Sequence, residues 1–274
     1  MNDFIISILL GIIEGVTEFL PVSSSAHLIL VPQFFCWPDQ GLTLDVAAHI
    51  GTLLAVLAYF WRDVVGLGQG LWQIAQRKRD PRGRLVGYLL LGSIPAMVIG
   101  FILDRYAGDS LRSPTVIAVT LIFFSLLLYA ADKLGLTVRR LEHLNMGHAL
   151  LIGILQCLAF IPGTSRSGIT ITMARFLGYE RLDAARFSFL LSIPTIAAAG
   201  LYKGFQLLQT GTSDQLHAAV LMVVCSAIAG FLAIAFIMYW LRRSGMGPFV
   251  LYRLGLGLYL LYVIYRMPGL LCGG

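Results

Sequence analysis

The sequence predicts an all-α, polytopic membrane protein with a single transmembrane domain over residues 1–274. Of the 274 residues, 58% are hydrophobic and 12% are charged, whereas a typical soluble domain has about 25% charged residues. No polar block is long enough to form an extramembrane domain. Apolar stretches of about 20 residues, the length that crosses a bilayer as a helix, recur along the chain. Together these observations exclude a soluble globular protein.

The first apolar stretch does not look like an ordinary span. Residues 4–20 carry Glu14 and Glu18 and end at Pro21, and the next apolar segment, 22–36, is short. Proline stops a helix, and lipid-exposed irregular backbone is excluded from the hydrocarbon core. The pattern therefore predicts a re-entrant helical hairpin, which enters and leaves the membrane by the same face.

A second stretch repeats this behaviour. Within residues 147–178, an apolar half-helix runs into the break Pro162-Gly163-Thr164-Ser165-Arg166-Ser167-Gly168, and a second half-helix follows. We expect a second re-entrant hairpin here.

Between and after these hairpins, the remaining apolar stretches predict six transmembrane helices. They lie near residues 46–64, 86–103, 114–131, 184–204, 216–241 and 248–266.

The positions of the basic residues orient the predicted spans. Basic clusters occur at 76–84, at Arg139-Arg140 and at Arg242-Arg243, and such clusters favour the cytoplasmic side. The three basic clusters lie on the same side of the membrane only if each hairpin returns to the membrane face by which it entered. The first hairpin then starts from outside, the second starts from the cytoplasm, and both chain ends lie outside.

The two halves of the chain also resemble one another. Gly11-Ile12-Ile13-Glu14 aligns with Gly153-Ile154-Leu155-Gln156, and a break lies seven residues beyond each Glu or Gln. Repeats inserted in opposite directions are common in transporters, with a site where the broken helices meet. We predict an inverted-topology repeat, with repeat 1 at about 1–132 and repeat 2 at about 147–266.

The net charge of +6 suggests membrane lipids rather than nucleic acid as the partner, because basic cytoplasmic loops face anionic headgroups. Four cysteines show no metal-like spacing, and we interpret them as small apolar residues. They are Cys36, Cys157, Cys225 and Cys272.

Arg166 follows the Pro-Gly break directly. There the first backbone N–H groups of a new helix are free, the helix dipole is positive, and the guanidinium fork matches phosphate oxygens. The sequence therefore predicts a phosphate site. The alternative is an arginine that snorkels, or that pairs with a glutamate and joins the hairpins.

Glu14 and Glu18 lie four residues apart, on one face of a helix. Two carboxylates with substrate phosphate oxygens suit Mg²⁺, and Ca²⁺ is also acceptable. The alternative is a proton or sodium relay in a transporter.

Ser24 and His27 share the face of the next helix and form a candidate nucleophile and base pair. Alternatively, His27 is the general acid or base for a water molecule, while the serines only hydrogen-bond the phosphate. For Ser23, the alternative is a purely structural role as a helix N-cap. His49, four residues after Asp45, either lines the same site or anchors its helix at the interface.

The segments 14–27, Glu-Gly-Val-Thr-Glu-Phe-Leu-Pro-Val-Ser-Ser-Ser-Ala-His, and 162–168 resemble the two signature motifs of the undecaprenyl-diphosphate phosphatases, the bacitracin-resistance family. The stretches 45–51, 187–194 and Tyr252-Arg253 support the likeness, which covers nearly the whole chain. Ala26 stands where the family often has Gly, and this small change affects only fine geometry.

The resemblance implies an integral-membrane phosphatase that converts undecaprenyl diphosphate to the monophosphate lipid carrier of cell-wall synthesis. It implies a divalent metal, six spans with two hairpins, and a site open to the periplasm of a bacterial inner membrane. The implied roles are catalysis for Ser24, His27 and Arg166, metal binding for Glu14 and Glu18, and substrate binding for Ser23, Ser25, Ser165, Ser167 and Gly168.

A transporter or lipid flippase with the same inverted hairpins is the rival interpretation. The sequence leaves open the choice between covalent and water attack, the metal, the prenyl chain length, an added flipping role and the oligomeric state.

Overall fold

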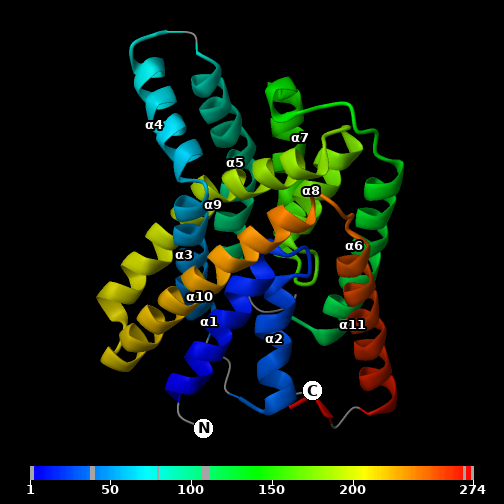
Figure 1. Cartoon of the computed structure of the whole chain (residues 1–274). Helices are drawn as coiled ribbons and strands as arrows, with labels where there is room; N and C mark the ends of the chain where they lie inside the picture. Colours follow the sequence, from blue (N-terminus) through cyan, green and yellow to red (C-terminus); the bar gives the residue numbers. More distant parts are fainter. Residues whose placement is uncertain (1–2, 38–40, 79, 107–111, 268–269, 273–274) are drawn as a thin grey trace.

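A computed structural model describes residues 3–37, 41–78, 80–106, 112–267 and 270–272 of the chain (Figure 1). The described residues form helices and no named strand, which confirms the all-α prediction. Arg79 of the predicted basic loop and the two chain ends, residues 1–2 and 273–274, lie outside the described residues.

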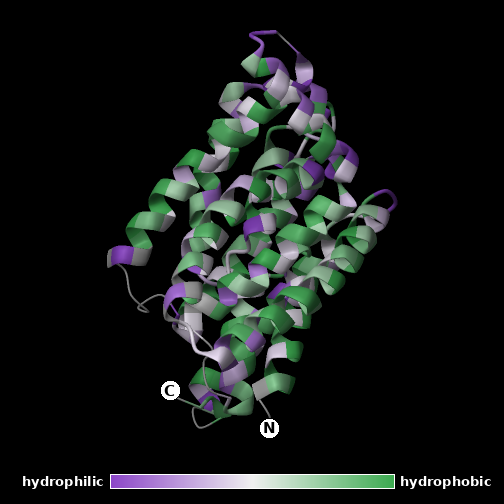
Figure 2. Ribbon diagram, turned by 90° about the vertical axis from the view of Figure 1, so that its left-hand side faces the viewer, coloured by the Kyte–Doolittle hydropathy of each residue, from purple (hydrophilic) through white to green (hydrophobic). Residues whose placement is uncertain are grey.

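Within the described residues, five helices are long and apolar enough to cross a membrane. They are α5 (Pro81–Tyr106), α6 (Pro114–Leu134), α9 (Arg181–Thr210), α10 (Ser213–Trp240) and α11 (Gly247–Arg266). Large apolar side chains such as Leu201, Phe205 and Leu232 stay exposed on them, and apolar residues dominate the middle of the molecule in Figure 2. The chain is therefore a multi-pass membrane protein.

The span predicted over 46–64 is wrong as a straight helix. The structure has α3 (Gly41–Tyr59) and α4 (Trp61–Ala75), which are bent by 87°. Counted as one broken span, the pair supplies the sixth crossing. Hydropathy continues through the bend, so it could not reveal the break. An ion pair from Asp63 on α4 to Arg186 on α9 fixes the new direction of the chain.

The first hairpin consists of α1 (Asp3–Phe19) and α2 (Ser24–Phe35). Its two helices meet inside the molecule, and both outer ends lie at the lower end in Figure 1, near the C-terminus. Ser23 caps α2 by accepting a hydrogen bond from the N–H of Ala26. The chain thus turns back after Pro21 as the sequence predicts.

The second hairpin runs from α7 (Met146–Gln156) and the short 3-10 helix η2 (Cys157–Phe160) into α8 (Arg166–Phe176). Its outer ends lie at the upper end of the molecule, so the two hairpins open in opposite directions (Figure 1). Near these outer ends, the N–H of Glu180 donates to the carbonyl of Arg139, which holds entrance and exit together.

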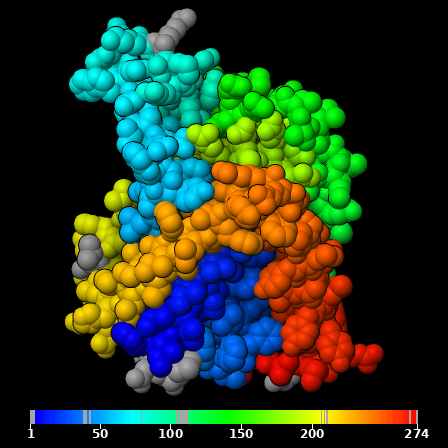
Figure 3. All heavy atoms as spheres, viewed as in Figure 1, coloured from blue at the N-terminus to red at the C-terminus, as the bar shows by residue number. Residues whose placement is uncertain are grey.

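Helix α10 covers α1 and α3 at very close range. A Cβ at Gly15 would lie 2.6 Å from the carbonyl oxygen of Ser226, and one at Gly51 would lie 1.9 Å from its hydroxyl. The Ser226 hydroxyl donates to the carbonyl of Ala48 at 2.7 Å. In Figure 3, α10 crosses the face of the molecule directly beside α1. These contacts fix α1 and α3 relative to one another.

Two of the three predicted basic clusters contribute to one pocket, which Arg82, Arg84 and Arg140 line. The connection from α10 to α11, which carries Arg242 and Arg243, is held to the end of α6, because the N–H of Met246 donates to Asp132 at 3.1 Å.

Two of the four cysteines form a disulfide between Cys36 and Cys272, with 5.3 Å between their Cα atoms. The interpretation of these two as apolar residues is wrong, because a pairing across 236 positions leaves no signal in local spacing. Cys157 and Cys225 are free cysteines, as expected.

Candidate active site

The breaks of the two hairpins meet in the interior of the molecule. The hydroxyl of Ser167, at the start of α8, donates to the carbonyl of Glu18 at 2.9 Å and lies 3.4 Å from that of Leu20. Ser167 is fully buried. The two segments with the signature motifs are therefore in direct contact, although 148 positions separate Glu18 from Arg166.

A third element closes this junction from the side. Arg253 on α11 is fully buried, and its guanidinium donates to backbone carbonyls from both breaks. The acceptors are Pro21 at 3.4 Å, Gly163 at 3.0 Å and Thr164 at 3.0 Å. Arg253 therefore holds the two breaks at a set distance from one another.

Glu18 is the centre of the site. Its Oε1 accepts hydrogen bonds from Nε and Nη2 of Arg166, at 3.1 and 2.9 Å. Its Oε2 accepts a hydrogen bond from the hydroxyl of Ser24 at 2.5 Å. Arg166 also donates from Nη1 to the carbonyl of Ser188 on α9, at 2.9 Å. One carboxylate thus links the candidate nucleophile of the first hairpin to the candidate phosphate-binding arginine of the second.

Glu14 lies one turn before Glu18 and is fully buried. Neither carboxylate oxygen of Glu14 has a hydrogen-bond partner among the described residues, an arrangement that is costly unless a cation neutralises the charge. His49 of α3 lies nearby, with Nδ1 at 3.2 Å from Glu14 Oε1 and Nε2 at 3.8 Å from Glu18 Oε2.

These three side chains fit a divalent metal. Glu14, Glu18 and His49 each offer one ligand atom, and the three atoms lie within 4.8 Å of one another. His49 Nδ1 lies 2.8 Å from the carbonyl of Asp45, so this nitrogen donates to that carbonyl and Nε2 is the ring atom that could bind a metal. Donation from the second ring nitrogen to a carbonyl is usual for metal-binding histidines. Two carboxylates with one imidazole also suit Mn²⁺ and Zn²⁺ besides Mg²⁺ and Ca²⁺.

His27 has partners other than Ser24. Its Nδ1 lies 2.7 Å from the carbonyl of Ser23, so it donates there, and its Nε2 lies 2.6 Å from the hydroxyl of Tyr252 on α11. The two rings stack with centroids 5.7 Å apart. The structure therefore gives Ser24 a carboxylate partner and fixes the tautomer of His27, and it shows no hydrogen bond between Ser24 and His27 within the described part of the chain.

The two breaks share an unusual backbone conformation. Ser23 has φ 78° and Ser165 has φ 71°, values that cost a residue with a side chain about 1–3 kcal/mol. Each hydroxyl caps the helix that follows and lies 3.3 Å from the hydroxyl two residues on, Ser25 or Ser167. Ser165 receives the N–H of Gly168 at 3.1 Å. The hydroxyls predicted to bind substrate thus also build the two helix N-termini.

Sequence reasoning missed three residues at this site. The spacing of His49 from Asp45 indicates a lining residue, but it does not indicate a metal ligand. Tyr252 and Arg253 are indicated only by the resemblance. No local pattern could assign their partners, because His27 and Tyr252 lie 225 positions apart.

Comparison with known proteins agrees with these motifs. A family model described as Bacitracin resistance protein BacA matches residues 7–259. The chain is 46% identical to undecaprenyl-diphosphatase 1 of Rhodospirillum rubrum, over 96% of each chain. It is 49% identical to the undecaprenyl-diphosphatases of Hahella chejuensis, over 94% of this chain and 97% of the relative, and of Alcanivorax borkumensis, over 95% and 98%. The chain therefore belongs to the bacitracin resistance protein BacA family.

Proposed function

We propose that this protein is an undecaprenyl-diphosphatase, an integral-membrane enzyme that releases inorganic phosphate from a polyprenyl diphosphate and leaves the monophosphate. The names of its relatives support this function over a transporter. The observation that carries the proposal is the junction at Glu18, where Ser24 and Arg166 bind the two oxygens of one carboxylate.

Arg166 is the residue that we assign to the terminal phosphate. Its guanidinium lies at the N-terminus of α8, where the free N–H groups and the helix dipole favour an anion. Charge on the equatorial oxygens grows in phosphoryl transfer, and fixed donors that face these oxygens stabilise the transition state. Ser23 and Ser25 at the start of α2, with Ser165, Ser167 and Gly168 at α8, complete the two facing helix ends.

Ser24 is the nucleophile in this proposal. Its Oγ attacks the terminal phosphorus as the bridging P–O bond breaks, and the prenyl monophosphate leaves. The hydroxyl proton passes to Glu18, whose Oε2 already accepts it at 2.5 Å. In the second step water attacks the phosphoserine, the Oγ–P bond breaks, Glu18 returns its proton to Oγ, and inorganic phosphate leaves. His27 is the base for that water, with its tautomer set by Ser23.

Glu14, Glu18 and His49 would hold a divalent cation. Such a cation, when bound, neutralises charge on the diphosphate oxygens. The prenyl tail lies outside the polar junction, among the apolar helix faces. We assign the basic loops to the cytoplasm by the positive-inside rule, and we assign the opening of the site to the outer side of the bacterial inner membrane, as the resemblance implies.

The direct test uses purified protein in detergent with a polyprenyl diphosphate and Mg²⁺ or Ca²⁺. We expect release of inorganic phosphate without any ion gradient and its loss on addition of EDTA. A transporter releases none, so absence of phosphate under every metal condition would overturn the proposal.

Three variants test the assigned roles. Arg166→Ala should abolish phosphate release, and Arg166→Lys should restore it only in part, because lysine keeps the charge without the fork. Acid quench during turnover should trap a phosphoserine at residue 24. An active Ser24→Ala variant with no trapped phosphoserine would replace the covalent route with direct attack by water.

A further inference from the structure

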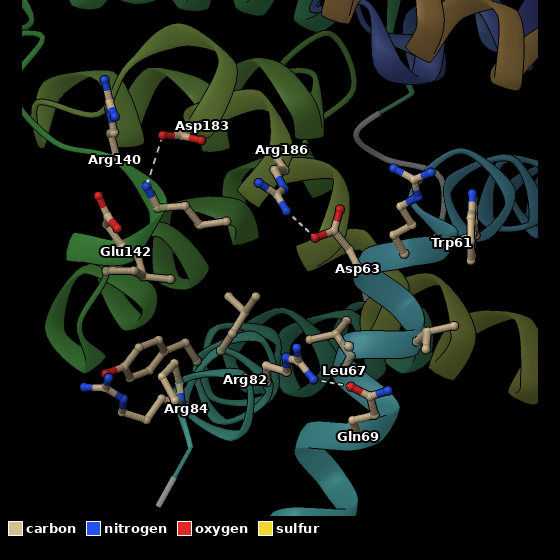
Figure 4. Close-up of a pocket in the computed structure, with 18 residues that line it drawn as sticks. Trp61, Asp63, Leu67, Gln69, Arg82, Arg84, Arg140, Glu142, Asp183 and Arg186 are labelled. Atoms are coloured by element: carbon tan, nitrogen blue, oxygen red, sulfur yellow. Dashed lines mark hydrogen bonds and ion pairs between the residues drawn. The ribbon is translucent and has the colours of Figure 1, made fainter.

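A polar cavity lies away from the junction of the hairpins, between α4, α5 and α9 (Figure 4). Its volume is about 940 Å³, within the range of small-molecule sites. The chain segments that line it are the first half of α4, the start of α5, the 3-10 helix η1 (Leu141–His143) and the start of α9. None of the residues assigned to the proposed phosphatase site lines it.

The cavity lies at the level where a bilayer has its headgroups. It is lined by Pro81 and Arg82 and by Asp183 and Arg186, and these residues occupy the first turns of two candidate spans, which begin at Pro81 and at Arg181. Trp61 follows the bend between α3 and α4 and is 57% exposed. Aromatic side chains of this kind are typical of the interface between membrane and water.

Positive charge exceeds negative charge in the lining. Five arginines face three carboxylates there. The arginines are Arg62, Arg82, Arg84, Arg140 and Arg186, and the carboxylates are those of Asp63, Glu142 and Asp183.

Much of the negative charge is already engaged. Asp63 pairs with Arg186, and Asp183 accepts the N–H of Leu141 at 3.1 Å. Arg140 pairs at 3.0 Å with Glu180, which does not line the cavity.

Three arginines keep their charge available to a ligand. Arg82 donates only to the neutral amide of Gln69 among side chains, and Arg62 lies over the ring of Trp61 at 5.3 Å. Within the described residues, neither of them, nor Arg84, forms an ion pair with a carboxylate. A guanidinium without a carboxylate partner is a strong binding group for phosphate oxygens.

The same cavity has an apolar wall. Val65, Leu67, Leu85 and Leu144 line it beside the arginines, and Val65 is 53% exposed. A free phosphate ion gains no favourable contact from an apolar wall, whereas the glycerol and upper acyl chain of a phospholipid pack against it. Basic pockets between helices at the cytoplasmic face are a known type of lipid headgroup site.

We propose that this cavity binds the phosphodiester headgroup of an anionic phospholipid from the cytoplasmic leaflet. Arg82 binds the phosphate, Arg84 adds positive charge to the cavity lining, Arg62 and Trp61 close one side, and the leucines contact the upper acyl chain. The site is separate from the hairpin junction, so its occupancy is independent of the proposed phosphatase chemistry.

The test is native mass spectrometry of the full chain in detergent, titrated with phosphatidylglycerol or with phosphatidylcholine. We expect one tightly retained phosphatidylglycerol and no comparable phosphatidylcholine. The variant R82Q/R84Q should weaken retention of phosphatidylglycerol about tenfold or more, since one lost charge-assisted contact is worth about a factor of ten. R82K/R84K should retain phosphatidylglycerol less tightly than the unaltered chain and more tightly than R82Q/R84Q, because lysine keeps the charge but lacks the guanidinium fork.

The matched control is R242Q/R243Q, which removes two exposed arginines outside the cavity. It should retain phosphatidylglycerol like the unaltered chain. Equal losses in both double variants would show general attraction to charge and overturn the proposal. Displacement of the lipid by millimolar inorganic phosphate, with phosphate itself bound, would assign the cavity to free phosphate and also overturn it.

Folding is checked independently by thermal unfolding and by phosphate release. Since Arg82 and Arg84 take no part in the proposed chemistry, R82Q/R84Q should keep its Tm and its basal activity. If the Tm of R82Q/R84Q falls, lipid retention by the charge-preserving R82K/R84K variant is the deciding measurement. Full lipid retention by R82K/R84K at an unchanged Tm would refute a role for the guanidinium forks.

Discussion

Glu14 differs from every other carboxylate in the site, because it is fully buried and neither of its oxygens accepts a hydrogen bond from the described residues. Glu18 next to it is satisfied by Arg166 and Ser24. Besides the imidazole of His49, 3.2 Å from its Oε1, Glu14 lacks a partner for its charge among the described residues, and we therefore propose that it binds a metal cation. We propose that Glu18 connects this metal to the reacting groups.

Glu14→Gln keeps the shape of the side chain and removes its charge. We expect the metal concentration for half-maximal activity to rise at least about tenfold, since even partners in the second coordination sphere change affinity by about 10–100-fold. The measurement is phosphate release against metal concentration after EDTA treatment. The control is Glu142→Gln, the same change at an exposed carboxylate. An unchanged metal dependence of Glu14→Gln would remove Glu14 from the metal set.

Tyr252 is a positioning residue for His27, through its hydroxyl at 2.6 Å from Nε2. Tyr252→Phe keeps the stacked ring and removes only that contact, which is worth about 1 kcal/mol. We expect kcat to fall about fivefold with little change in KM, and the pH profile of kcat to shift. Tyr259→Phe, on the same helix and stacked on Phe34, should match the unaltered chain. Identical kinetics for both variants would contradict the role.

At the scale of the element, each hairpin ends its first half-helix inside the protein and therefore leaves carbonyl groups that need donors. Ser167 supplies one donor, and Arg253 supplies donors to three carbonyls from both breaks. Helix α11 is thus more than a lipid-facing span, because it carries the side chain that closes the junction.

Arg253→Lys tests this role. The lysine keeps the charge but cannot reach three carbonyls at once, and each buried group left without a partner costs about 1–3 kcal/mol. We expect a lower Tm in detergent together with reduced phosphate release. Arg266→Lys, at the exposed end of the same helix, is the control. Should Arg253→Lys keep the Tm and activity of the unaltered chain, the bridge between the breaks is dispensable.

At the scale of the whole molecule, the Cys36–Cys272 disulfide ties the outer end of the first hairpin to the end of the chain. Disulfides persist in oxidising compartments. Helix α2, whose C-cap is Cys36, reaches the lower end of the molecule, opposite the upper ends of α4 and α5 (Figure 1).

Loss of this disulfide should destabilise the protein without abolishing its chemistry. We expect C36S/C272S, or treatment with dithiothreitol, to lower the free energy of unfolding by about 2–4 kcal/mol, measured as a lower Tm. The control C157S/C225S removes the two free cysteines and should keep its response to dithiothreitol. A Tm of C36S/C272S equal to that of the unaltered chain would show that the link carries no stability.

The sequence by itself determined the class of the protein, the two hairpins and the family, because these depend on hydropathy, on proline and on contiguous motifs. The sequence did not reveal the bend at Phe60, because the apolar run continues through that residue. It also did not reveal the disulfide, because the pairing of cysteines is not a local property. The inverted repeat stays a prediction, supported by the matching backbone at Ser23 and Ser165.

Only the tertiary structure decided which groups meet. The spacing of Ser24 and His27 places them on one face of a helix and suggests that they interact. In the folded protein, Ser24 instead hydrogen-bonds to Glu18, and His27 hydrogen-bonds to Tyr252. It likewise brought His49 to the two glutamates and Arg253 to both breaks. The physical reason is that the partners come from different helices, far apart in the chain, and their distances are set by how closely α10 and α11 pack against the hairpins.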